Sequence, residues 1–287
     1  MKDKLSMILS MAIFGTIGIF VELIALPSGL IASFRGIVGA VVILLVMLIS
    51  GRKPDFSAIK SKWWLLVLSG GAIGFNWILL FEAYRHTGIP VATVCYYMAP
   101  LFVTALSPMV LKEKLSPKQI VCIFIALLGI VAVSGVLQGG ATKLTGVALG
   151  LGAAALYASV ILMNKFMGNV PAYEKTAIQL GSAGLVVLPY AILTGGEVTI
   201  NLKSFLLLVV VGVVHTGFAY LLYFEAVKNL KGQVVAILSY IDPAAAIILS
   251  SVIFMQMPKG YELIGTVLIM CAAFFSEINF GKKRVAQ

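Results

Sequence analysis

Long apolar runs, separated by short polar breaks, fill the chain from end to end. A helix that crosses a membrane needs about 20 mostly apolar residues, and ten segments of the chain have that character. The breaks carry turn-forming or charged residues, as in Pro27-Ser28-Gly29. The ten segments are residues 5–26, 29–50, 63–84, 88–111, 118–138, 144–165, 172–193, 204–227, 232–255 and 260–280. The pattern therefore predicts an all-α membrane protein with ten transmembrane helices.

Composition agrees with a chain embedded in lipid. Of its 287 residues, 61% are hydrophobic and 11% are charged, whereas about 25% are charged in soluble domains. These values exclude a cytosolic enzyme, a disulfide-stapled secreted module and a disordered chain. The basic residues come in ones, twos and threes between apolar runs, so we expect membrane lipids and no nucleic acid as partners.

The distribution of lysine and arginine predicts the orientation. With the N-terminus in the cytoplasm, 16 basic residues fall on the cytoplasmic side and 4 on the outer side, while Arg35 lies within a span. This bias favours ten spans with both termini in the cytoplasm, and it places the protein in the cell membrane as a multi-pass chain.

The chain resembles itself when it is shifted by 143 residues. Phe81-Glu82-Ala83 then meets Phe224-Glu225-Ala226 without a gap. We therefore divide the chain into two halves, residues 1–140 and 141–287, of five expected helices each. Because five is odd, the halves insert in opposite orientations, and such inverted repeats are typical of secondary transporters.

The segment from Phe81 to Gly135 reads FEAYRHTGIPVATVCYYMAPLFVTALSPMVLKEKLSPKQIVCIFIALLGIVAVSG. It resembles the signature of the EamA family in the drug/metabolite transporter superfamily. The shared features are a small-residue turn, a mid-helix proline at Pro100, a glutamate at Glu113 that closes the helix, and a glycine-rich helix after it. In the second half Gln256 stands where a second glutamate is expected. The resemblance implies a ten-helix basket around a central cavity and, commonly, export of metabolites.

Ionisable residues within the spans need an explanation, because a charge at the centre of a membrane helix costs about 2.5–3.5 kcal/mol or more. Glu22 and Arg35 flank the turn at Pro27 at similar depth, so we expect them to pair. The pair either fixes the hairpin or lets the carboxylate exchange its arginine for a proton or a substrate amine. His215 lies at the middle of its span, where it either faces a cavity or is hydrogen-bonded core.

Two prolines at matched positions, Pro100 and Pro243, are expected to kink or unwind their helices. Such breaks expose backbone polar groups toward a cavity in many transporters, although an ordinary kink explains them as well. Asp242 directly precedes the second proline. We group Glu22, Arg35, Asp242, Pro100 and Pro243 as candidates for coupling or gating.

Aromatic and polar residues recur at matched mid-helix positions, which suggests a cage for planar, aromatic or cationic solutes. The alternative is that aromatic residues are simply common in membrane proteins. The substrate-binding candidates are Phe14, Asn76, Trp77, Tyr97, Tyr157, His215, Tyr220 and Tyr240. Glu82 and Glu225 lie at helix ends near Arg85 and Lys228, where local salt bridges explain them.

We therefore predict a secondary transporter that moves small metabolites, such as amino acids, nucleobases or organic cations, by alternating access. Export is the expected direction, and protons are candidate coupling ions. A passive channel or facilitator is the alternative. No nucleotide-binding, metal-ligand or catalytic motif occurs in the sequence, so we expect no enzyme activity, catalytic residue, metal or cofactor. A monomer is a plausible functional unit.

Overall fold

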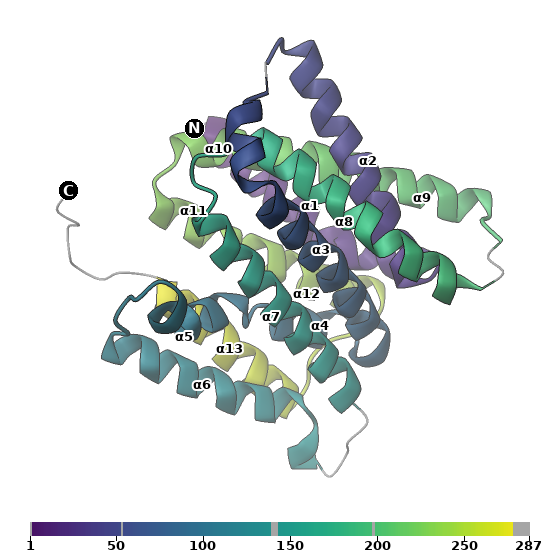
Figure 1. The fold of residues 1–287 in the computed structure, drawn as a ribbon. Helices are drawn as coiled ribbons and strands as arrows, with labels where there is room; N and C mark the ends of the chain where they lie inside the picture. Colours follow the sequence, from purple (N-terminus) through teal and green to yellow (C-terminus); the bar gives the residue numbers. More distant parts are fainter. Residues whose placement is uncertain (1, 53, 139–142, 197–198, 278–287) are drawn as a thin grey trace.

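A computed structural model describes residues 2–52, 54–138, 143–196 and 199–277, and the basic tail Lys282-Lys283-Arg284 lies outside these ranges. Within them every regular element is helical (Figure 1). In chain order the helices are α1 Lys2–Leu23, α2 Ser28–Ile49, α3 Phe56–Thr87, α4 Ile89–Tyr96, α5 Ala99–Val110, α6 Pro117–Val133, the short turn η1 Val136–Gln138, α7 Leu144–Lys165, α8 Ala172–Gly195, α9 Leu202–Gly212, the π-helical turn η2 Val213–Phe218, α10 Ala219–Asn229, α11 Gly232–Ser239, α12 Ile241–Ile253 and α13 Tyr261–Glu277.

Seven helical runs are long and apolar enough to cross a membrane. Five are the single helices α1, α2, α3, α7 and α8, and two are the interrupted runs Ile89–Val110 and Leu202–Asn229. Among the described residues, three further apolar helices are shorter, namely α6, α12 and α13. The chain is thus an all-helical membrane protein.

Two helical runs break just before a proline. α4 ends at Tyr96 and α5 begins at Ala99, directly before Pro100. α11 ends at Ser239 and α12 begins two residues before Pro243. A proline inside a helix lacks the backbone donor and its ring clashes with the preceding turn, so these breaks lie where the sequence places them.

Glycines let several helices cross at short distance. α2 packs against α8, and a Cβ added to Gly36 would lie 2.7 Å from the backbone nitrogen of Gly184. α6 packs against α13 at the far end of the molecule (Figure 1), and a Cβ added to Gly265 would lie 2.5 Å from the carbonyl oxygen of Gly129. Both crossings require residues without a side chain, since the obstructing atoms belong to the backbone.

Candidate functional site

A cavity of about 320 Å³ lies where helices of residues 1–140 meet helices of residues 141–287. The first half contributes α1 to α5, and the second contributes α7 and α10 to α13. Ten of the residues singled out from the sequence line it: Phe14, Arg35, Asn76, Trp77, Tyr97, Pro100, Tyr157, Tyr220, Tyr240 and Asp242. Glu22, His215 and Pro243 are not among its lining residues.

Aromatic rings form much of the cavity wall. Tyr97 and Tyr240, which occupy matched positions of the two halves, have ring centroids 6.1 Å apart. Phe14 contacts Tyr220 edge-on at 5.2 Å. Tyr157 stacks on Tyr96, the last residue of α4, with ring centroids 5.3 Å apart. Offset and edge-on ring contacts of this kind stabilise a fixed aromatic surface, on which a planar or apolar solute can lie.

Arg35 brings a positive charge to the cavity. Its side chain is 4% exposed, and its Cζ lies 3.8 Å from the ring centroid of Trp77. The Nε atom donates a hydrogen bond to Oγ1 of Thr216 at 3.2 Å, and that hydroxyl donates to the carbonyl oxygen of Val211 at 2.9 Å. Trp77 and Thr216 therefore orient the guanidinium without neutralising it.

Asp242 brings a carboxylate to the cavity at the break between α11 and α12. Its Oδ2 atom accepts a hydrogen bond from the hydroxyl of Tyr97 at 3.0 Å. The same hydroxyl lies 3.3 Å from the carbonyl oxygen of Ser239. Because α12 begins one residue earlier, the helix break sets the position of this carboxylate.

The polar atoms at the cavity that have no hydrogen-bond partner among the described residues include Oδ1 of Asn76 and the hydroxyl of Tyr240. The other end of the Asn76 amide donates to the carbonyl oxygen of Ala153 at 2.5 Å. Buried polar atoms are normally paired, so these two can accept or donate hydrogen bonds to a bound solute.

His215 does not face the cavity, contrary to one of its two expected roles. It is 2% exposed, shares a hydrogen bond of 2.8 Å with Oγ1 of Thr16, and packs on the ring of Phe20 at 4.4 Å. It lies in the π-helical turn η2, which also carries Thr216. His215 therefore lies inside the protein, in the same turn that places the hydroxyl of Thr216 against Arg35.

The expected pair of Glu22 and Arg35 does not form. Glu22 is exposed near the end of α1, which stops at Leu23, whereas Arg35 is buried on α2. Similar depth in a hairpin does not determine which helix face a side chain occupies. The predicted pair was wrong because the depth of the two residues was considered and the helix face on which each lies was not.

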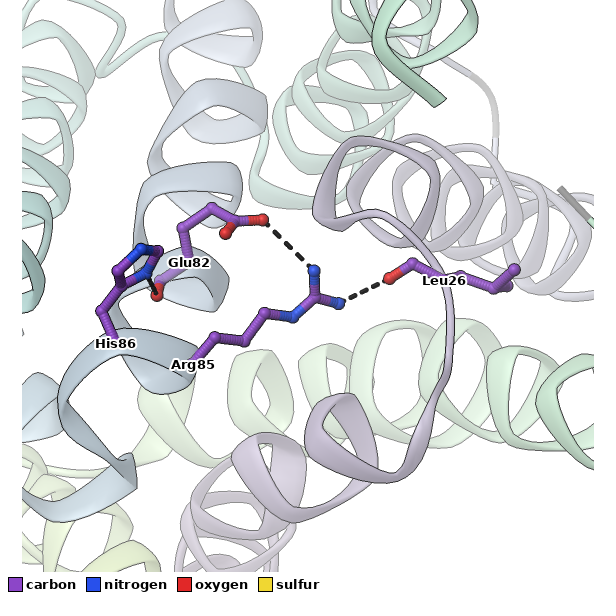
Figure 2. A network of polar contacts seen from close by, with 4 residues as sticks. All are labelled: Leu26, Glu82, Arg85 and His86. Carbon is purple, nitrogen blue, oxygen red and sulfur yellow. Dashed lines mark hydrogen bonds and ion pairs between the residues drawn. The ribbon is translucent and has the colours of Figure 1, made fainter. Parts of the chain in front are cut away.

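A polar network lies at the helix ends beside the turn between α1 and α2 (Figure 2). Nη1 of Arg85 contacts Oε1 of Glu82 at 3.3 Å, which confirms the expected local salt bridge. Nη2 of Arg85 donates to the carbonyl oxygen of Leu26 and so ties the turn to α3. The matched carboxylate of Glu225 instead contacts Lys2 at 3.6 Å, so the expected local bridge to Lys228 was wrong.

The EamA-like transporter family model matches the chain twice, over residues 3–135 and 144–277. The chain belongs to this family. The two matches cover each half of the chain nearly end to end, in agreement with the resemblance expected around Pro100 and Glu113.

Curated relatives of this EamA-like chain are named as transporters. "Uncharacterized transporter YxxF" of Bacillus subtilis is 30% identical over 270 residues, which are 92% of this chain and 86% of that protein. "Probable amino-acid metabolite efflux pump" of Salmonella typhimurium is 26% identical over 236 residues, 77% of each chain. These names describe transporters and efflux pumps, not enzymes.

A solved structure described as "Crystal structure of protein" shares the fold of this EamA-like chain. Its TM-score is 0.67 at 20% sequence identity, and the match covers 96% of this chain and 97% of the other. A likeness at this identity shows the fold alone.

Several cavity residues were missed from the sequence. Tyr84, Tyr96, Tyr223 and Glu277 line the cavity, and Thr216 holds Arg35. Adjacency to chosen residues was the available signal for two of them, since Tyr96 precedes Tyr97 and Thr216 follows His215. No comparable signal marked Glu277, at the end of the last described helix.

Proposed function

We propose that the chain is a secondary transporter that binds a small metabolite in the central cavity and exports it across the cell membrane by alternating access. Ten spans form two inverted halves, residues 1–140 and 141–287, with both termini in the cytoplasm. The cavity between the halves carries this proposal, because it gathers a cation, a carboxylate and a wall of aromatic rings.

Helix boundaries support the repeat. α4 and α11 each contain eight residues and begin 143 residues apart. α6 and α13 each contain 17 residues and begin 144 residues apart. A long helix of the first half, α3, corresponds to the run from α9 to α10, in which the π-helical turn lies. With five spans to a half, equivalent helices run in opposite directions.

The extent of the cavity supports a conformation that is open to the cytoplasm, whereas export as the direction is supported by the name of the Salmonella typhimurium efflux pump. In the proposed topology the cavity reaches Glu277, at the cytoplasmic end of α13, and α4 packs against α12 on the outer side. This is the inward-facing state, which takes up a solute from the cytoplasm. One chain encloses the whole cavity, which supports a monomer as the functional unit.

We assign proton coupling to Asp242 rather than to Glu22. Asp242 lies on the cavity and shares a hydrogen bond with Tyr97, so a proton bound there can respond to the solute and to the state of the gates. Glu22 is exposed at a helix end and has no such position.

Counterflow in proteoliposomes tests the proposal. Vesicles loaded with unlabelled amino acids, nucleobases or organic cations receive the matching labelled pool outside, and we expect saturable, trans-stimulated uptake for one pool. Trp77→Ala should lower that uptake at least about tenfold, because Trp77 forms the wall and supports Arg35. Trp63→Ala, at a side chain 61% exposed, is the matched control. Flux that does not saturate and shows no trans-stimulation would refute the carrier and support the channel.

A further inference from the structure

Arg35 is a buried cation with no counter-ion in the described part of the chain. Its side chain is 96% buried, as its 4% exposure implies. Among the described residues, no carboxylate lies within ion-pair distance of it. Isolated charges in a membrane are costly unless they are paired, so the position requires either a structural partner or a ligand.

The protein contacts of Arg35 leave two donor atoms available. Thr216 accepts only from Nε, and Trp77 contacts the face of the guanidinium. In the part of the chain that the structure describes, neither Nη atom has a hydrogen-bond partner. The two Nη atoms form a planar fork that matches the two oxygens of a carboxylate, and Arg35 lines the cavity.

We propose that Arg35 is the carboxylate-binding residue of the transport site, so that the substrates are small carboxylate-bearing metabolites. The inference rests on the proposed transport function and narrows its substrate class. Organic cations without an acid group and neutral nucleobases are then excluded. Asp242, on the same cavity, is the group that accepts an amino group when the carboxylate carries one.

Matched solutes test this assignment by binding to the purified protein. Each set shares one skeleton: leucine carries both groups, 4-methylpentanoate lacks the amine, and 3-methylbutylamine lacks the carboxylate. Equivalent aromatic and hydroxylated sets complete the panel. We expect acids and amino acids of at least one set to bind in thermal-shift and calorimetric titrations, and the corresponding amine to bind at least about tenfold more weakly.

Variants assign the effect to Arg35. Arg35→Gln should lower carboxylate affinity at least about tenfold, Arg35→Lys should restore part of it, and Asp242→Asn should weaken binding of the amino acid relative to the acid without an amine. If Arg35→Gln does not fold, Thr216→Val, which removes the acceptor of Nε, should weaken the acids but not the amines. Preferential binding of amines, or no binding by any acid of the panel, overturns the assignment.

Transport separates this assignment from the proposed function. Counterflow of amines but not of acids would support the proposed carrier function and would refute the carboxylate-binding role of Arg35. Acid binding that depends on Arg35, without counterflow of any bound acid, would support the subsite and refute the carrier.

Two matched helix ends independently indicate a pair of gate contacts. The carbonyl oxygen of Ser107 accepts from the backbone nitrogen of Glu113 at 3.3 Å, and Ser250 accepts from Gln256 at 3.4 Å. The residues before them, Lys112 and Met255, have φ of 57° and 55°. The members of each of these three pairs are 143 residues apart. Glu113 and Gln256 therefore occupy equivalent positions in the same kind of backbone turn in the two halves.

Only one of the two side chains is engaged. Oε1 of Gln256 accepts from the backbone nitrogen of Ile89 at 3.0 Å, which caps the N-terminus of α4 across the interface of the halves. Glu113 is exposed, and its carboxylate contacts no donor among the described residues. The corresponding helix start is that of α11, where the cap residue Lys231 provides no side-chain hydrogen bond.

We infer that Gln256 closes the outer gate by capping α4 and that Glu113 closes the inner gate by capping α11 in the outward-facing state. An N-terminal helix turn has free backbone donors and a partial positive charge, so a glutamate is a suitable cap. This inference rests on the proposed inverted halves and alternating access.

Accessibility of a cavity cysteine tests the two contacts. Ser239→Cys is placed in a background in which Cys95, Cys122 and Cys271 are alanine, and a membrane-impermeant maleimide is added outside. Because losing a cap changes a conformational equilibrium by roughly three- to tenfold, Gln256→Ala should raise the labelling rate, and Glu113→Ala should lower it by similar factors.

Conservative variants and the carrier activity complete the test. Glu113→Gln keeps an acceptor and should label like the parent chain. An unchanged rate in Glu113→Ala beside a raised rate in Gln256→Ala overturns the inner contact, and unchanged rates in both overturn the pair. Counterflow by the parent chain is measured separately, so that refutation of the transport function can be distinguished from refutation of the gate contacts.

Discussion

Replacing Gly36 by alanine tests the close crossing of α2 and α8. The new Cβ would lie 2.7 Å from the backbone nitrogen of Gly184 and 2.7 Å from the carbonyl oxygen of Leu180. Ordinary contact begins at 3.4 Å, so the two backbones must separate by about 0.7 Å. Neither obstructing atom can rotate away, because both belong to the backbone of a helix.

The magnitude follows from two opposing effects. Inserting a methyl group into a close-packed contact costs about 1–3 kcal/mol, and replacing glycine by alanine within a helix returns about 1 kcal/mol. We therefore expect Gly36→Ala to lower the free energy of unfolding by up to about 2 kcal/mol. Gly181→Ala is the matched control on the same interface, since its Cβ would meet only the Ala40 side chain at 3.7 Å. This variant should raise the free energy of unfolding by up to about 1 kcal/mol.

Thermal unfolding of the two variants in the same detergent measures the difference. At about 2–4 °C per kcal/mol for chains of comparable size, Gly36→Ala should melt several degrees below Gly181→Ala. Arg35 precedes Gly36, so the same displacement should weaken solute binding. Equal Tm values for the two variants would show that the crossing is looser than described and would refute the reasoning.

Two further variants address the cavity. Tyr97→Phe removes the donor to Asp242 and should lower counterflow several-fold, because the carboxylate loses its partner; Tyr96→Phe is the control in the same assay, and equal losses would contradict the specific role of Tyr97. His215→Ala removes the contact with Thr16 and should lower Tm by a few degrees while Kd for the solute stays unchanged; a shifted Kd would place His215 at the site.

The apolar pattern predicts the helices well because lipid imposes their length and continuity. Pro100 and Pro243 also predict where the long runs break, since proline chemistry is local. The π-helical turn Val213–Phe218 is different. It packs against α2, and no residue type in it signals a π turn.

The site was partly predictable because duplicated positions marked it. Tyr97 and Tyr240 are equivalent in the repeat and lie in ring contact. The predicted pairing of Arg35 with Glu22 was wrong because the sequence shows how deep a residue lies in a span but not which face of the helix it occupies. Its actual partners, Trp77 and Thr216, lie 42 and 181 positions away in the chain, so only the packed helices bring them together.

The way Arg35 is held fits a carrier better than a structural ion pair would. A buried carboxylate partner would neutralise the guanidinium, and a solute would have to break that pair in every cycle at a cost of several kcal/mol. Trp77 and Thr216 stabilise the cation without competing for its outer donors. In the proposed assignment the guanidinium of Arg35 therefore stays available to a carboxylate of the solute, and the solute can leave without a protein ion pair having to reform.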